Sequence, residues 1–260
     1  MRRWLIILLL VFFSLCCIVI GYALYNYYTP PTERKAYIIP HHNDDTLRIA
    51  YIGDSWAAMH KEHECILAQI IEDSIHRPIK VSSFGMHGKT SKEIYENLFE
   101  NQNLHNFMLQ GYDYCFISAG INDTYKKMSP EYYKKSMENI IRFMFTNHIH
   151  PIILDIPDYD IDKAYERQQT ARQILRKISI SITGSQINCK QTFRNTLSDL
   201  VNDNGEWKLN ILKYLEWNSD YQNDLKSYYL SDGMHLNKKG YAKLDSCIAL
   251  HVIHNCNLWK

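Results

Sequence analysis

A serine, a histidine and an aspartate stand where nucleophilic catalysis could be carried out. Ser55 follows Gly53-Asp54 directly after an apolar run, and Asp232 and His235 are three residues apart near the C-terminus. A serine hydroxyl becomes a nucleophile when a histidine accepts its proton and a carboxylate orients the imidazole ring. These residues predict covalent acyl chemistry, with Ser55 as nucleophile, His235 as base and Asp232 as the partner of His235.

The same chemistry needs hydrogen-bond donors for the negative charge that develops on the substrate oxygen. The candidates are the backbone N–H groups of Ser55 and Gly88 and the side-chain amide of Asn122. A glycine at position 88 lets the backbone approach a substrate closely. We expect the neighbouring Asp54 and Asp123 to have a structural role, holding their loops through hydrogen bonds to backbone groups.

Short apolar runs alternate along the chain with amphipathic segments. The strands and helices that this alternation predicts must position the candidate catalytic residues. The pattern predicts strands over residues 47–52, 79–82, 112–118 and 149–156, with a fifth candidate at 209–215. Helices are predicted over 57–75, 91–98 and 163–182, from Ser129-Pro130 onward, and from about Lys238 onward. Such alternation indicates an α/β fold of three layers, α/β/α, in which helices cover both faces of a central parallel sheet.

Ligands of such sheets bind at the carboxyl ends of the strands. Three of the predicted strands end in the sequences Gly53-Asp54-Ser55, Gly85–Ser91 and Gly120–Thr124. The sequence Asp232-Gly233-Met234-His235 precedes the last predicted helix. A second D-x-x-H sequence, Asp73 to His76, falls at the end of a predicted helix, and we reject it because that position is not a strand exit.

In this order the sequence blocks resemble those of the SGNH (GDSL-type) hydrolase superfamily, from about residue 47 to about residue 253. A named tripeptide occurs by chance in about 3% of chains this long, so the order and strand-end placement of the blocks carry the resemblance. The resemblance implies a flavodoxin-like fold and ester hydrolysis without a metal or other cofactor. It also implies a catalytic set of Ser55, His235 and Asp232, and an oxyanion hole formed by Ser55, Gly88 and Asn122. Trp56 replaces the leucine of the family signature and is expected to shape the pocket.

The N-terminus predicts a membrane anchor. Residues 4–24 carry no charge and follow Arg2 and Arg3; as a helix they would extend about 30 Å, the thickness of a hydrocarbon core. The arginines predict an N-in orientation, with the rest of the chain in the periplasm or outside the cell. A cleaved signal peptide is the alternative, since Gly21-Tyr22-Ala23 loosely resembles a cleavage site.

Three segments are therefore expected: a transmembrane signal anchor at 1–24, a stalk or linker at 25–46, and one hydrolase domain at 47–260. With 29 basic and 28 acidic side chains, the chain has no basic field that would indicate nucleic-acid binding. His60 and His63 lie near two glutamates but form no H-E-x-x-H motif, so we expect them on a solvated helix face and predict no metal.

These observations together predict a membrane-anchored serine esterase that acts on a small-molecule or glycan ester. A short acyl ester is expected, such as an O-acetyl group on a glycan. Two alternatives stay open. The acyl group is transferred to a sugar acceptor instead of water, or the domain is a non-catalytic glycan-binding module of the cell envelope. The oligomeric state is not predicted.

Overall fold

The computed structural model describes residues 2–160, 169–171, 173, 174, 177, 190–203, 210–212 and 221–255. Its centre is a parallel sheet with the strand order β2-β1-β3-β4-β5. The strands are β1 (Leu47–Gly53), β2 (Ile79–Gly85), β3 (Tyr114–Ser118), β4 (His150–Leu154) and β5 (Asn210–Leu212). The predicted α/β fold with a central parallel sheet is confirmed, and β5 lies within the segment predicted for a fifth strand.

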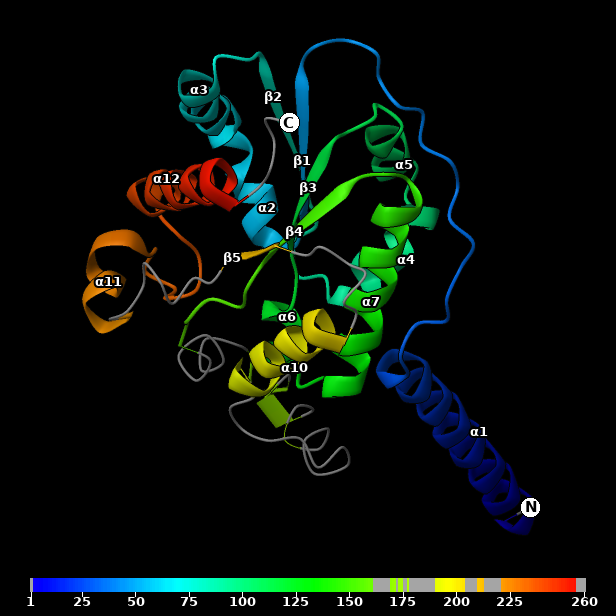
Figure 1. Ribbon diagram of the computed structural model, residues 1–260. Helices are drawn as coiled ribbons and strands as arrows, with labels where there is room; N and C mark the ends of the chain where they lie inside the picture. The colour runs from blue at the N-terminus through cyan, green and yellow to red at the C-terminus, as the bar shows by residue number, and fades with distance from the viewer. Residues whose placement is uncertain are drawn as a thin grey trace.

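Helices cover both faces of this sheet (Figure 1). One face packs on α4 (Ser91–Glu100), α5 (Gln102–Met108), α7 (Pro130–Thr146) and α10 (Lys190–Asp203). The other packs on α2 (Ser55–His60), α3 (Glu64–Ile75), α11 (Tyr221–Tyr228) and α12 (Lys238–Asn255). The short α6 (Ile121–Lys126) follows β3.

Alternating residues of each strand enter different cores. Ala50 and Ile52 of β1 belong to the core beneath α4 and α7, whereas Ile49 and Tyr51 belong to the core beneath α3 and α12. Successive side chains of a strand point to opposite faces, so both faces of β1 are buried. This accounts for the continuous apolar run from which a strand was predicted.

The structure corrects one predicted helix. A single helix was expected over 57–75, but α2 ends at His60, a 3-10 turn covers Lys61–His63, and α3 begins at Glu64. This turn changes the direction of the chain between α2 and α3, the longer helix that covers the sheet. The helix predicted over 163–182 lies largely outside the described residues.

The N-terminal helix α1 (Arg2–Tyr28) projects away from the rest of the molecule (Figure 1). Within the described part of the chain it is the one helix long and apolar enough to cross a membrane, and its most apolar stretch is not buried. These properties fit a membrane anchor, and a signal sequence has the same ones.

The predicted stalk, residues 25–46, begins within α1, which ends at Tyr28; the part that follows α1 runs along the domain and contacts it. The N–H of Arg34 donates to Tyr95 Oη at 2.7 Å, and the N–H of Ile39 donates to Asn147 Oδ1 at 2.8 Å. Ile39 is buried in the core. These contacts hold residues 34–39 against α4 and the end of α7.

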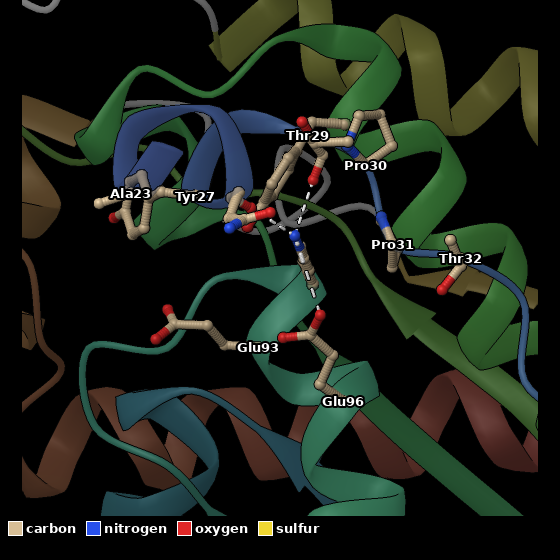
Figure 2. A pocket seen from close by; sticks show the side chains of 11 residues that line it. Ala23, Tyr27, Thr29, Pro30, Pro31, Thr32, Glu93 and Glu96 are labelled. Carbon is tan, nitrogen blue, oxygen red and sulfur yellow. Dashed lines mark hydrogen bonds and ion pairs between the residues drawn. The ribbon is translucent and has the colours of Figure 1, made fainter. Parts of the chain in front are cut away.

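The end of α1 is also tied to α4. Lys92 Nζ donates to the backbone carbonyl of Asn26 at 2.7 Å and to that of Thr29 at 2.8 Å. A lysine in this place satisfies carbonyl groups that the end of a helix leaves unpaired. A cavity of about 530 Å³ lies at this junction, lined by α1, residues 29–32, α4 and Tyr132 (Figure 2).

Candidate active site

Three strand-exit loops are joined at the carboxyl edge of the sheet. Gly53 of β1 pairs in register with Gly85 of β2 and with Ser118 of β3. Beyond these pairs, the N–H of Met86 donates to the carbonyl of Gly53 at 2.8 Å, and the N–H of Asp54 donates to that of Ser118 at 3.1 Å. The exit loops of β1, β2 and β3 are therefore adjacent, as the sequence predicted from parallel strands.

Ser55 is the first residue of α2, directly after β1. Asp54 caps this helix, because its Oδ1 accepts the N–H of Trp56 at 3.0 Å. The turn from strand to helix requires glycine at position 53, where a Cβ atom would lie 2.2 Å from the carbonyl oxygen of Ser118. Asp54 is fully buried, and this desolvation raises the pKa of its carboxyl group to about 7.

His235 bridges Ser55 and Asp232. Its Nε2 lies 2.8 Å from Ser55 Oγ, and its Nδ1 lies 2.6 Å from Asp232 Oδ2. The other oxygen, Oδ1, accepts the backbone N–H groups of Met234 at 2.9 Å and of His235 at 3.0 Å. Partial burial by itself raises the pKa of Asp232, but the hydrogen bonds from His235 and the backbone outweigh it and lower that pKa.

This arrangement sets the tautomer of His235. The lowered pKa keeps Asp232 ionised near neutral pH, so its oxygens only accept hydrogen bonds. Nδ1 must then carry the ring proton and donate it to Oδ2, which leaves Nε2 as the acceptor for the Ser55 hydroxyl. The structure therefore brings together the three residues that the sequence singled out, in an order suited to removing a proton from Ser55.

Two tyrosines hold the loop that carries Asp232 and His235. Tyr221 Oη donates to the carbonyl of Gly233 at 2.6 Å, and Tyr229 Oη donates to that of Asp158 at 2.9 Å. The loop closes on itself where the N–H of Leu230 donates to the carbonyl of His235 at 2.7 Å. Neither tyrosine was predicted, because both stand in a stretch without clear periodicity and their acceptors are backbone groups.

Two of the three predicted oxyanion donors are backbone N–H groups. Neither the N–H of Ser55 nor that of Gly88 donates to another described residue. Gly88 has a φ of +71°, and a Cβ atom there would meet nothing within 4 Å. Glycine therefore suits the left-handed backbone of this position, and the space that a side chain would occupy is open.

Asn122, the third predicted donor, lies in the first turn of α6. Its Nδ2 donates to the carbonyl of Lys89 at 3.0 Å. The amide group has a second hydrogen, which this bond does not use. The same contact ties the loop that holds Gly88 to α6, so the side chain has both a structural partner and a spare donor.

Two carboxylates join these loops further. Asp123, fully buried, accepts the N–H of Ser91 at 2.8 Å and its hydroxyl at 2.5 Å; burial raises the pKa of Asp123 to about 6. Glu93 lies 3.0 Å from Lys89 Nζ and 3.1 Å from Lys126 Nζ. Asp54 and Asp123 thus bind backbone groups as predicted, whereas the role of Glu93 was not foreseen, because a glutamate near two lysines is common on helix surfaces.

Two expectations about neighbouring side chains were wrong. Trp56 does not shape a pocket: it is 1% exposed and its ring packs edge-on to Tyr241 in the core. His60 and His63 are not on a solvated face, since both are buried, with exposed fractions of 0% and 5%. The spacing of Trp56, His60, His63 and Leu67 continues one apolar stripe, a signal that could have placed both histidines inside.

The rejected D-x-x-H sequence lies away from this site. Asp73 accepts a hydrogen bond from Gln69 Nε2 at 2.7 Å, and His76 ends α3 in a left-handed conformation with a φ of +55°. Among the described residues, no group of three or more histidine, cysteine, aspartate or glutamate side chains is arranged to hold a metal ion.

No protein-family model matches this sequence. No curated protein matches it either.

Several solved structures match the fold. A lipase/acylhydrolase from Enterococcus faecalis has a TM-score of 0.55 at 18% identity, with 80% of this chain and 95% of that chain covered. An acetyl xylan esterase has a TM-score of 0.55 at 13% identity, covering 79% and 100%. A GDSL-like lipase from Bacteroides thetaiotaomicron has a TM-score of 0.51 at 15% identity, covering 79% and 87%. The resemblance seen in the sequence is confirmed at the level of structure: this chain has the fold of the GDSL-type (SGNH) lipases, acylhydrolases and esterases.

Proposed function

We propose that this protein is a metal-independent serine hydrolase that cleaves carboxylic esters. The observation that carries the proposal is the hydrogen-bonded line from Ser55 through His235 to Asp232, at 2.8 and 2.6 Å. It lies at the carboxyl edge of the sheet, beside the loops that carry Gly88 and Asn122. A nucleophile, a base, a group that orients the base, and donors for an oxyanion are the parts that acyl transfer needs.

The proposed reaction has two halves. His235 Nε2 takes the proton of Ser55 as Oγ attacks the ester carbonyl carbon, and the charge on the carbonyl oxygen is stabilised by the N–H groups of Ser55 and Gly88 and the Asn122 amide. The ester C–O bond then breaks, and His235 passes its proton to the departing alcohol. Water, deprotonated by His235, attacks the acyl-enzyme, and the acid leaves as Ser55 regains its proton.

We further propose that the substrate carries a short acyl ester, such as an O-acetyl group on a glycan. Support comes from the similar fold of an acetyl xylan esterase and from the apolar α1, which would place the domain at a membrane. In this proposal residues 4–24 span the membrane with the N-terminus inside, residues 25–46 form the linker, and the domain at 47–260 lies in the periplasm or outside the cell.

Acyl transfer to a sugar hydroxyl is the second candidate, because the same acyl-enzyme serves both reactions. The geometry around Ser55 favours an enzyme over a non-catalytic glycan-binding module, since binding alone gives no reason for the His235–Asp232 pair. Incubation with acylated glycans in the presence of sugar acceptors distinguishes the two reactions. Hydrolysis releases free acid, whereas transfer gives an acylated sugar.

The test of the proposal is replacement of the nucleophile and its base. The Ser55→Ala protein should fold but lose kcat on aryl acetates to near background, because it cannot form the acyl-enzyme. His235→Ala should be about as damaging, and the double variant little worse than either, because the two residues act as one unit. A fluorophosphonate should label Ser55 in the unmodified protein. A folded Ser55→Ala protein with substantial esterase activity would overturn the proposal.

A further inference from the structure

A second, fully buried His–Asp pair lies behind the nucleophile. His60 is the last residue of α2, the short helix that begins at Ser55, and Asp245 lies on α12. His60 Nε2 is 2.5 Å from Asp245 Oδ1, and both side chains are 0% exposed. The other ring nitrogen of His60 lies 3.3 Å from Ser83 Oγ on β2. The pair therefore connects α2, α12 and the sheet.

Other contacts reinforce the same junction. His63 Nδ1 lies 3.7 Å from the second oxygen of Asp245. The ring of His63 stacks on that of Tyr241, with 5.2 Å between centroids. Tyr241 Oη donates to the carbonyl of Trp56 at 3.3 Å. Each of these contacts links α12 to the segment that begins at Ser55.

The stability of the fold does not by itself explain why the His60–Asp245 pair is buried. Two well-packed apolar side chains of similar size are often as stabilising as a buried ion pair, because the charged groups must first lose their hydration. Among the described residues, Asp245 Oδ2 accepts no hydrogen bond, and His63 Nδ1 lies 3.7 Å from it. The pair forms a short, directional hydrogen bond, which fixes the distance between α2 and α12. An apolar contact has no such directionality.

That distance bears directly on the candidate active site. Ser55 opens α2, and α12 begins just after His235. Asn237 attaches the His235 loop firmly to α12: its carbonyl accepts the N–H of Tyr241 at 2.9 Å, and its Oδ1 accepts that of Gly240 at 3.0 Å. A shift of α12 relative to α2 therefore changes the separation of Ser55 Oγ and His235 Nε2.

We propose that His60 and Asp245 are positioning residues for the esterase reaction. By clamping α2 to α12 they keep the Ser55 hydroxyl within hydrogen-bond distance of His235 Nε2. The inference rests on the proposed function. Loss of the clamp should slow proton transfer from Ser55 while leaving substrate binding nearly unchanged, because neither residue is exposed to a substrate.

The test compares two variants of the full-length protein in detergent. Asp245→Asn replaces the carboxyl group of the pair by an amide, and the double variant His60→Leu, Asp245→Leu replaces both side chains by apolar ones of similar size. The matched control is Asp113→Asn, which alters a His–Asp contact of 3.0 Å with His42 at the opposite end of the sheet. Hydrolysis of 4-nitrophenyl acetate gives kcat and KM, and exhaustive fluorophosphonate labelling counts the competent sites.

In both variants of the pair, we expect kcat per labelled site to fall about tenfold to a hundredfold, with KM within about twofold of the unmodified protein. The initial rate of labelling should fall by the same factor as kcat. Asp113→Asn should keep its kcat per site.

An unchanged kcat per site in either folded variant would overturn the inference. So would failure of both variants to fold while Asp113→Asn folds, since the pair would then serve the fold alone. If the unmodified protein neither hydrolyses the ester nor becomes labelled, it is the proposed function that fails.

Discussion

Replacing Asp232 by asparagine removes one charge from the candidate active site while keeping the shape of the side chain. In the structure, Asp232 Oδ1 accepts two backbone N–H groups, at 2.9 and 3.0 Å, and Oδ2 faces His235 Nδ1 at 2.6 Å. In the variant, the two backbone donors should hold the amide oxygen in the Oδ1 position. The NH₂ group then occupies the position that faces Nδ1.

This orientation forces His235 into the other tautomer. Two donors cannot share one hydrogen bond, so Nδ1 must give up its proton and accept from the amide. The neutral ring then carries its proton on Nε2, which points at Ser55 Oγ and can no longer accept the hydroxyl proton. The base is lost although every atom of the site stays close to its present position.

The expected loss of kcat in Asp232→Asn follows from the catalytic groups that the variant keeps. The oxyanion donors and the nucleophile are intact, and only base catalysis is lost, so we expect kcat to fall about 10³–10⁴-fold. This corresponds to about 4–5.5 kcal/mol of lost transition-state stabilisation. Asp232→Ala should be milder, because without an amide donor facing Nδ1 the neutral His235 ring can still carry its proton on that nitrogen.

Hydrolysis of an aryl acetate measures this effect, with circular dichroism to verify folding. The sequence offers a matched control in Asp73→Asn, which alters the other D-x-x-H sequence; in the part of the chain that the structure describes, Asp73 bonds to Gln69 on its own helix and to no other side chain. That control should keep its kcat. A folded Asp232→Asn protein that retains more than about a tenth of kcat would refute the tautomer argument.

Four further predictions concern other parts of the molecule. Asn122→Ala should lower kcat about 10²–10³-fold by removing one oxyanion donor; a kcat within about twofold of the unmodified protein would exclude the side chain from that role. Burial raises the pKa of Asp54 from 3.8 to about 7, so the folded protein retains a proton that the unfolded chain releases. Binding of that proton makes its full contribution to the free energy of unfolding below pH 3.8, and this contribution is lost as the pH rises to about 7. Asp54→Asn keeps the helix cap without ionising. The Tm of the variant minus the Tm of the unmodified protein should therefore increase as the pH rises from 3.8 to about 7; a Tm difference that does not change with pH would contradict this. Esterase activity should survive EDTA, and a loss restored by zinc would reveal a metal requirement. The full-length protein should sediment with membranes, whereas mature protein beginning after Ala23 would identify α1 as a cleaved signal.

Local pattern was sufficient to predict much of this fold. The strands β1, β3 and β4 are largely apolar and largely buried, and the helices α7 and α12 carry apolar stripes at helical spacing, so these elements can be recognised from residues close together along the chain. Ser55, Gly88 and Asn122 could be predicted for a related reason. They lie in the segments that follow strands which must be parallel, and the carboxyl ends of parallel strands meet at one edge.

The sequence by itself determined the α/β alternation, the order of the motif blocks and the apolar N-terminal helix, since each depends on residues close together along the chain. Only the tertiary structure decided what the buried polar side chains bind. His60 and Asp245 are 185 residues apart, and nothing near either of them indicates the other. Tyr221 and Tyr229 bind backbone carbonyl groups, which every residue carries and no sequence distinguishes. A hydrogen bond between distant segments depends on how the layers pack, and so it becomes visible only once the chain has folded.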